Sequence, residues 1–242
     1  MRKFGLLGKK LDHSFSKTFF TGFFEKNRID AGYENVEIPA IEDFLRIPAL
    51  EEFTGMNVTI PYKTAIIPFL DELSDEARQI GAVNTIKFTD GKMIGYNTDA
   101  FGFQQSIKPF LNNHHERALI LGTGGASRAV AHVLKNIGLN VLYASRDPQQ
   151  PGEFAYSDIN SHMVNACKMI VNCTPVGTYP GIADMPDFPV EFLTPEHFVV
   201  DLIYNPEQTK LLKEAAAKGA ITLNGYSMLK EQALKAWEIW ND

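Results

Sequence analysis

Three polar side chains are concentrated in one short segment, Asn57 to Lys63. Asn57 and Thr59 lie two positions apart in a strand-like stretch, so their side chains share one face. Pro61 suits the first turn of a helix, which puts Lys63 in that turn. A lysine there opposes the helix dipole, and an exposed lysine is its ordinary interpretation. If other polar groups converge on it, its ammonium could instead stabilise a developing negative charge on oxygen and supply a proton.

Polar groups also interrupt the pattern further along the chain. Asn84 stands within the apolar run Ala82–Phe88, where a buried amide needs a hydrogen-bonding partner or a ligand. Asp99 follows Gly95–Thr98 and precedes a helix expected over 100–111. Asp99 therefore either caps that helix or faces a site, and Asn84 is either a satisfied core amide or a ligand-binding group.

Two serines near the N-terminus form a third polar position. Ser14 and Ser16 flank Phe15 at a strand-to-helix junction. Their hydroxyl groups suit a carboxylate ligand, whereas Ser16 alone could simply cap the helix. The apolar face of this expected helix has the helical repeat and consists of Phe19, Phe20, Phe23 and Phe24.

A glycine-rich turn follows the apolar run 118–121 and precedes a helix-like stretch that ends near Gly138. In a dinucleotide-binding unit, one glycine permits the tight turn, the next lets the backbone approach the pyrophosphate, and the helix N-terminus attracts the phosphates. Ser127 replaces the third glycine of the G-x-G-x-x-G pattern. The context of strand, helix and second strand nevertheless favours a dinucleotide over a plain connection. The turn consists of Gly122, Thr123, Gly124, Gly125, Ala126 and Ser127.

The end of the second strand bears on the choice between NAD and NADP. An acidic residue there binds the ribose 2′-hydroxyl, and a basic residue accommodates a 2′-phosphate. Ser145 is neutral, and Arg146 is able to pair with a phosphate or to lie on the adenine. Asp147 follows and would repel a 2′-phosphate. These residues favour NADP, with NAD as the alternative cofactor and a solvated surface charge as the structural interpretation of Arg146.

Short elements must position the polar groups of the first half. The pair Asp90-Gly91 between two apolar runs is typical of a β-hairpin turn. Strands are expected at 36–38, 56–60, 82–88 and 93–96, and helices are expected from residue 16, over 63–70 and over 75–80.

From Arg117 onward, continuous apolar runs alternate with helix-like stretches. Such runs are typical of strands buried on both faces of a parallel sheet, and the alternation predicts a doubly wound α/β fold. The tail, 228–240, has an amphipathic pattern in which Trp237 and Trp240 either pack inward or form an interface, and packing is favoured. Strands are expected at 118–121, 141–144, 169–171, 198–200 and 221–223.

Composition narrows the class of function. The 242 residues are 45% hydrophobic and 21% charged, which suits one large domain or two modest ones. The net charge of -6 argues against a nucleic-acid partner. There is neither a signal-peptide pattern nor an apolar run of about 18 residues, so no membrane association and a cytoplasmic location are expected. We expect no metal site, and we interpret Cys167 and Cys173 as buried hydrophobes.

A series of motifs runs in a fixed order along nearly the whole chain. They are His13–Ser16, Asn57–Lys63, Gly81–Thr85, Gly95–Asp99, the glycine turn, Asn172–Gly177, Asp201–Pro206, Gln208 with Thr209, Gly225–Leu229 and Gln232. In these motifs the chain resembles the shikimate dehydrogenase family. The resemblance implies NADP-dependent conversion between 3-dehydroshikimate and shikimate, a step of aromatic amino-acid (chorismate) biosynthesis.

The resemblance also implies a domain organisation. It consists of two α/β domains, a substrate-binding domain over 1–100 and a Rossmann-type dinucleotide-binding domain over 101–226. The C-terminal helix, 227–242, is expected to return to the first domain. The implied assembly is a monomer or a homodimer.

Roles for individual residues follow from the resemblance. Lys63 and Asp99 look like the acid/base pair, and Ser14 and Ser16 would hold the substrate carboxylate. The ring hydroxyls would be bound by Thr59, Lys63, Asn84, Asp99 and Gln232, with Tyr204 nearby. Besides the glycine turn, Ser145 and Arg146, the expected cofactor-binding residues are Asp75, Thr174, Leu202 and Gly225.

Departures from the family pattern leave two alternatives. Lys10 and Lys17 stand where the family usually has prolines, and Gln150 stands where it commonly has a second arginine. The missing basic contact and Asp147 keep an NAD-preferring quinate/shikimate dehydrogenase as one alternative. The other is a sensor that binds a ring acid without turning it over. Intact Lys63 and Asp99 argue against a sensor, because it needs no proton donor.

Overall fold

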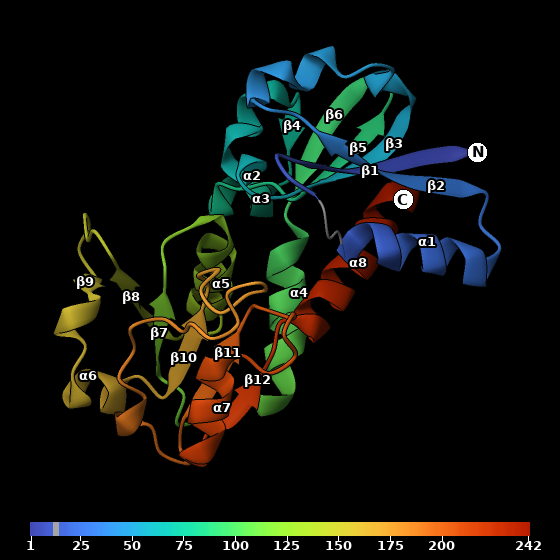
Figure 1. The fold of residues 1–242 in the computed structure, drawn as a ribbon. Coiled ribbons are helices and arrows are strands. Elements are labelled where there is room, and N and C mark those ends of the chain that lie inside the picture. Colours follow the sequence, from blue (N-terminus) through green and yellow to red (C-terminus); the bar gives the residue numbers. More distant parts are fainter. Residues whose placement is uncertain (12–14) are drawn as a thin grey trace. The chain divides into compact units, whose positions relative to one another are not determined.

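The computed structural model of the chain describes residues 1–11 and 15–242. It divides into two compact units (Figure 1). The first unit comprises Met1–Phe101 and Gln232–Asp242, and the second comprises Gly102–Glu231. The chain therefore leaves the first unit and returns to it near its C-terminus.

The first unit is built on a mixed sheet with the strand order β2-β1-β3-β5-β6-β4. The pairs β1·β2, β1·β3 and β4·β6 are parallel, and the pairs β3·β5 and β5·β6 are antiparallel. Asp90 and Gly91 have φ angles of 51° and 73°, as a two-residue hairpin turn between β5 and β6 requires. The strands are β1 (Arg2–Gly8), β2 (Ala31–Glu37), β3 (Phe53–Val58), β4 (Glu72–Leu73), β5 (Thr85–Thr89) and β6 (Lys92–Tyr96).

Aromatic side chains join two helices to this sheet. In α1 (Phe15–Asn27), Phe20 and Phe24 are buried as the helical spacing predicts. The end of α8 (Tyr226–Asn241) inserts Trp240 against Phe4, with ring centroids 4.8 Å apart, and Trp237 packs on Phe4 and Phe23. The prediction that both tryptophans pack inward is therefore confirmed. The shorter helices are α2 (Tyr62–Ala65) and α3 (Asp75–Ile80), with 3-10 turns η1 (Ile41–Arg46), η2 (Leu50–Glu52) and η3 (Ile67–Phe69).

The second unit is built on a fully parallel sheet with the strand order β12-β11-β10-β7-β8-β9. The six strands can be numbered by their order along the chain within this unit. Counted from the β9 edge, they then lie in the order third, second, first, fourth, fifth and sixth, which is the strand order of dinucleotide-binding folds. This confirms the predicted fold class. The strands are β7 (Arg117–Leu121), β8 (Asn140–Ser145), β9 (Glu153–Ala155), β10 (Met169–Asn172), β11 (Phe198–Asp201) and β12 (Ile221–Leu223).

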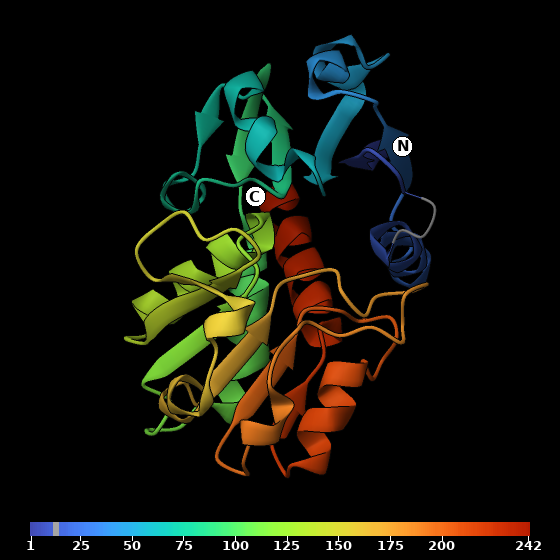
Figure 2. The same ribbon diagram turned by 60° about the vertical axis from the view of Figure 1, so that its left-hand side comes forward.

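Helices cover both faces of the parallel sheet. The step from β7 to β8 and the step from β11 to β12 run in opposite directions across the sheet. Right-handed crossovers therefore put α5 (Gly125–Asn136) and α7 (Lys210–Ala217) on opposite faces (Figure 2). The remaining helices are α4 (Thr98–Ile107) and α6 (Ser161–Ala166), with 3-10 turns η4 (Lys108–Phe110), η5 (Tyr156–Asp158) and η6 (Val190–Phe192). In the part of the chain that the structure describes, no helix is long and apolar enough to cross a membrane.

Several element bounds differ from the sequence prediction. The strand expected over 56–60 ends at Val58, and the strand expected over 82–88 begins only at Thr85. The helix expected over 63–70 is divided into α2 and η3, because Pro68 has no N–H to continue an α-helical ladder. The N-terminal helix begins at Phe15, so Ser16 lies in its first turn and does not precede it as a cap.

Candidate active site

A short ion pair stands at the centre of the first unit's polar residues. Lys63 Nζ lies 2.6 Å from Asp99 Oδ2, and the two side chains are 17% and 8% exposed. Lys63 is in the first turn of α2, and Asp99 is in the first turn of α4, where a carboxylate suits the helix dipole. Ion pairs sheltered from water seldom add stability, because desolvation offsets the attraction between the charges. A chemical role accounts for this pair better than a stabilising one.

Asn84 holds the other oxygen of the same carboxylate. Its Nδ2 donates to Asp99 Oδ1 over 2.9 Å and lies 3.0 Å from Thr98 Oγ1, while its Oδ1 accepts the backbone N–H of Thr98 over 2.7 Å. The buried amide thus has protein partners on both ends. Because each oxygen of Asp99 has its own donor, the orientation of the carboxylate toward Lys63 is fixed.

Two further expected substrate residues belong to the same unit. Gln232, from α8, is buried and places Oε1 3.3 Å from Thr98 Oγ1 and 3.4 Å from Asn84 Nδ2. Thr59 is half-buried directly after β3, and its backbone N–H donates to the carbonyl of Leu7. The first unit therefore gathers amide, hydroxyl, ammonium and carboxylate groups, which together suit a polyhydroxylated ligand.

The sequence did not single out Tyr33, which joins two of the motifs. Tyr33 Oη donates to Asn57 Oδ1 over 2.7 Å. Burial raises the pKa of Tyr33 far above its usual value, and a hydrogen bond from Ser16 acts in the opposite direction. Tyr33 thus connects the expected carboxylate-binding Ser16 with the core of the sheet. Ser14 lies outside the described residues.

The glycine turn in the second unit has the geometry that phosphate binding requires. Gly122 has φ +97°, a conformation that favours glycine. A side chain at Gly124 would meet nothing within 4 Å, so the backbone at the start of α5 is open to an approaching ligand. Ser127 is buried and its Oγ donates to the carbonyl of Gly124 over 2.6 Å, so the third position packs closely without a glycine. These residues fit a dinucleotide pyrophosphate.

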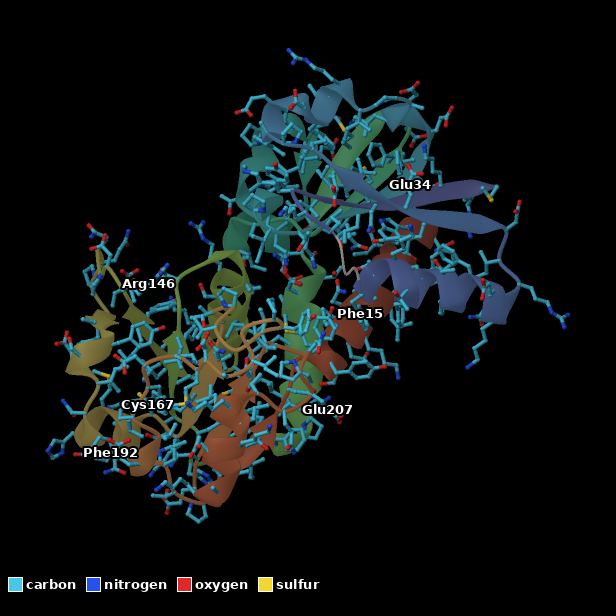
Figure 3. The ribbon with its side chains drawn as sticks, viewed as in Figure 1. Phe15, Glu34, Arg146, Cys167, Phe192 and Glu207 are labelled. Carbon is cyan, nitrogen blue, oxygen red and sulfur yellow. The ribbon has the colours of Figure 1, made fainter. Side chains whose placement is uncertain are left out.

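An exposed arginine, Arg146, and an acidic residue, Asp147, follow the last residue of β8. Arg146 follows the strand and is exposed (Figure 3). Ser145 is buried, and its Oγ accepts the backbone N–H of Asp147 over 3.2 Å. Asp147 Oδ1 in turn accepts from Gln149 Nε2 over 2.7 Å. The exposed guanidinium of Arg146 fits a 2′-phosphate, and the side chain of Asp147 is held by Gln149.

Thr174, Leu202 and Gly225 meet other parts of the same unit. Thr174 follows β10, and its methyl group lies 2.9 Å from the position that a Cβ on Gly122 would take. A Cβ on Gly225 would overlap the carbonyl oxygen of Leu202, so only glycine fits there. The reversal of strand order between β7 and β10 is the switch point where open α/β sheets bind ligands. The structure therefore brings Thr174 to the glycine turn at that point.

Two further expected site residues are Asp75 and Tyr204. Asp75 belongs to the first unit, where its side chain is 91% exposed and pairs with Arg78 over 2.9 Å. Tyr204 belongs to the second unit, and partial burial raises the pKa of its phenol.

The cysteines do not resemble a metal or redox site. Cys167 is buried, as expected, and burial raises the pKa of its thiol to about 11. Cys173 is only partly buried, which corrects the expectation that both cysteines are buried hydrophobes. No group of three or more metal-binding side chains occurs among residues 1–11 and 15–242.

The strand order and the open glycine turn at its switch point define a Rossmann-type dinucleotide-binding protein, with a second α/β unit that carries a sheltered ammonium–carboxylate pair. A family profile described as the shikimate dehydrogenase substrate binding domain matches residues 6–86. A shikimate dehydrogenase (NADP(+)) from Desulforamulus reducens is 38% identical, over 98% of this chain and 88% of its own length. The chain belongs to the shikimate dehydrogenase family.

Solved structures agree with this assignment. The shikimate 5-dehydrogenase of Thermus thermophilus, in complex with NADP(H) and shikimate, is 35% identical and superposes with a TM-score of 0.88 over 99% of this chain and 93% of its own. A quinate dehydrogenase from Corynebacterium glutamicum, in complex with NAD, is 28% identical with a TM-score of 0.88 over the same shares of the two chains. The architecture alone therefore does not decide between the two cofactors.

Proposed function

We propose that the protein is an NADP-dependent shikimate dehydrogenase that reduces 3-dehydroshikimate reversibly to shikimate in aromatic amino-acid biosynthesis. The observation that carries the proposal is the 2.6 Å pair of Lys63 and Asp99 in the unit that contains the substrate-binding-domain match. The first unit then binds the ring acid and the second binds the cofactor. Bound NADPH supplies the hydride.

The protein's part in the reaction is electrostatic and positional. As hydride reaches the carbonyl carbon, negative charge grows on the carbonyl oxygen, and a positioned donor stabilises it. Lys63 carries three ammonium protons and is the donor that we assign to this oxygen. Asp99 keeps the ammonium in place, and Asn84 keeps Asp99 in place. In the oxidative direction, the same lysine receives the proton of the hydroxyl.

The remaining polar residues of the first unit select the substrate. Thr59, Asn84 and Gln232 offer hydroxyl and amide groups to the ring hydroxyls, and the serines at the N-terminal motif offer hydroxyls to the carboxylate. A polyhydroxylated ring leaves such groups unpaired if any hydroxyl is missing, and unpaired buried groups discriminate strongly between substrates. This supports a hydroxylated ring acid over an apolar one.

The choice of cofactor depends on the residues after β8. Exposed Arg146 supports NADPH, because a guanidinium pairs well with the 2′-phosphate. Asp147 favours the second candidate, an NAD-preferring quinate/shikimate dehydrogenase, because its carboxylate lies next to that position in the sequence. We place NADPH first.

A rate matrix tests the proposal. Steady-state rates are measured with NADPH and NADH, each against 3-dehydroshikimate and 3-dehydroquinate. The proposed function predicts the highest kcat/KM for NADPH with 3-dehydroshikimate. A higher kcat/KM for NADH with 3-dehydroquinate would establish the second candidate. Absence of turnover in all four combinations, with the ring acid still bound, would instead indicate a sensor.

A further inference from the structure

Three buried polar side chains join the carboxyl ends of β10 and β11 in the second unit. Asn172 and Asp201 are partner residues of these two parallel strands, and both are fully buried. Asn172 Nδ2 donates to Asp201 Oδ1 over 3.0 Å. Thr209 Oγ1 donates to Asp201 Oδ2 over 2.7 Å. A carboxylate therefore lies at the centre of a closed hydrogen-bond network.

The carboxylate determines which way the amide of Asn172 faces. Asp201 in its ionised form only accepts hydrogen bonds, so the NH₂ group of Asn172 must face it. The amide oxygen then faces the other way and accepts two hydrogen bonds from Thr174, the backbone N–H over 2.9 Å and Oγ1 over 2.7 Å. The opposite amide orientation would put two acceptors against each other and two donors against each other. Asp201 thus sets Thr174 through Asn172.

The same carboxylate sets a second loop. The backbone N–H of Ile203 donates to Asp201 Oδ1 over 3.1 Å. The carbonyl of Ile203 accepts from the backbone N–H of Gly225 over 3.0 Å, and the carbonyl of Leu202 occupies the space that a side chain on Gly225 would need. The turn at Leu202 and its contact with Gly225 therefore depend on Asp201.

The first of these loops reaches the glycine turn. The methyl group of Thr174 lies against Gly122, and the backbone N–H of Cys173 donates to the carbonyl of Leu121 over 2.9 Å. A shift of Thr174 would therefore disturb Gly122, the first residue of the glycine turn. A continuous set of contacts runs from Asp201 to that turn.

A buried acid is costly at this position. Burial raises the pKa of Asp201 to about 6, and among the described residues only hydrogen-bond donors, with no basic side chain, oppose that effect. An uncharged side chain would fill the same space without the desolvation of a charge. A function that needs a strict acceptor explains why a carboxylate stands there.

We propose that Asp201 is a positioning residue for the cofactor, which sets Thr174 through Asn172 and sets the Leu202–Gly225 contact through Ile203. This inference rests on the proposed function, because these two loops are the ones expected around the nicotinamide. Asp201 takes no part in proton transfer. Its loss should therefore misplace the nicotinamide while the binding of the ring acid remains intact.

The variant Asp201→Asn tests this role in the full-length protein. An amide has nearly the same shape but no longer obliges Asn172 to donate. We expect kcat to fall about 10- to 100-fold, as for a misplacement near 1 Å, with the KM for 3-dehydroshikimate within about twofold of the wild-type value. Hydrogen exchange should become faster in 173–178 and 202–206, with β7 and β8 unchanged. Asp187→Asn, an exposed carboxylate of the same unit, is the matched control for loss of charge.

Each outcome has one meaning. A kcat within twofold of wild type, with unchanged exchange in 173–178, would overturn the proposal. Faster exchange spread evenly over the second unit would also overturn it, because it would indicate a purely structural role. If the variant does not fold, the wild-type protein provides the test. A local opening that breaks the Asn172–Asp201 hydrogen bond but leaves Asp201 buried raises the pKa of the carboxyl group further, so it is favoured by protonation. Protection of 173–178, corrected for intrinsic exchange, should therefore fall as the pH drops through about 6. Constant protection would contradict the proposal.

Failure of the proposed function can be distinguished from failure of the Asp201 proposal. NADPH binding and turnover are first measured on the wild-type protein. If wild-type protein binds no NADPH and turns over no substrate, the proposed function fails, whereas the exchange measurement on 173–178 still reports on the Asp201 network.

Discussion

At the scale of single residues, the groups around the Lys63–Asp99 pair fix the positions of its two charges. Lys63 binds one carboxylate oxygen and Asn84 binds the other. The side chains of Lys63 and Asp99 are both largely buried. Removal of either one would therefore leave the charge of the other poorly solvated and unpaired. The arrangement restricts the ammonium to one place, which a general acid requires and a surface ion pair does not.

The residues after β8 give a prediction about cofactor choice. Asp147→Thr removes a negative charge near the expected 2′-phosphate and keeps a hydrogen-bonding side chain. We expect the ratio of kcat/KM for NADPH to that for NADH to rise roughly three- to tenfold, since one screened charge interaction is worth about 1 kcal/mol. Steady-state kinetics with both cofactors measure the ratio. Asp187→Thr should leave it unchanged, and an unchanged ratio in Asp147→Thr would remove the argument from charge repulsion.

Most of the candidate site residues could be named from motifs, but their connections could not. Lys63, Asn84 and Asp99 were expected to act together, and the structure joins them by hydrogen bonds. Tyr33 and Asp201 were not expected as linking residues. Their partners are distant in sequence and become neighbours only through strand pairing, which a single sequence does not encode locally.

At the scale of elements, local sequence signals predicted the structure where a residue type favours a particular turn or where apolar spacing favours a helix. The Asp90-Gly91 turn and the phenylalanine stripe of α1 were predicted for such reasons. The bounds of β1 were not predicted, although a strand was expected before the 13–16 motif and β1 is an interior strand of the sheet. Its Gly5 has no side chain to mark a face, and a Cβ there would meet the Phe53 ring at 2.9 Å. The close packing at Gly5 thus weakens the hydrophobic signal of β1.

A pair of glycine variants tests the packing of α8 on the sheet. A Cβ on Gly55 would overlap the indole of Trp240, whose Nε1 donates to the carbonyl of Ile86. We expect Gly55→Ala to lower the free energy of unfolding by about 1 to 3 kcal/mol through overpacking. Gly22→Ala, in α1 with open space around it, should instead raise it by roughly 0.5 to 1 kcal/mol. Urea denaturation measures both, and equal effects would contradict the packing described for Trp240.

At the scale of the whole molecule, the class of fold was predictable and the path of the chain was less so. Buried apolar runs separated by helices indicated the parallel sheet of the second unit. The first sheet mixes parallel and antiparallel pairs, and its composition gave no comparable signal. The return of the C-terminal helix, expected over 227–242, was expected only from the family resemblance, because contacts such as Asn84 with Gln232 span 148 positions. In the structure, the segment that belongs to the first unit is Gln232–Asp242.

The pH dependence of stability should report the buried carboxyl group. The pKa of Asp201 is raised from 3.8 to about 6, so the folded protein keeps this proton over a range in which the unfolded chain has lost it. The contribution of Asp201 to the free energy of unfolding is therefore fully present below pH 3.8 and is lost as the pH rises through about 6. The loss is on the order of 3 kcal/mol.

Denaturation of wild type and Asp201→Asn at several pH values isolates this contribution, because the other titrating groups are shared. The difference between the two proteins should change across that window and be constant above it. A difference that does not vary with pH would show that Asp201 titrates normally.

The central claim is tested most directly by the rate of NADPH oxidation with saturating 3-dehydroshikimate in Lys63→Ala. The control is Lys92→Ala, which removes an exposed lysine of the same unit that pairs with Glu72. We expect kcat of Lys63→Ala to fall by about two to four orders of magnitude, the usual scale for a lost general acid, with NADPH binding unchanged and the control near wild type. A Lys63→Ala enzyme that turns over at a near-normal rate would contradict the assignment of Lys63 as the proton donor.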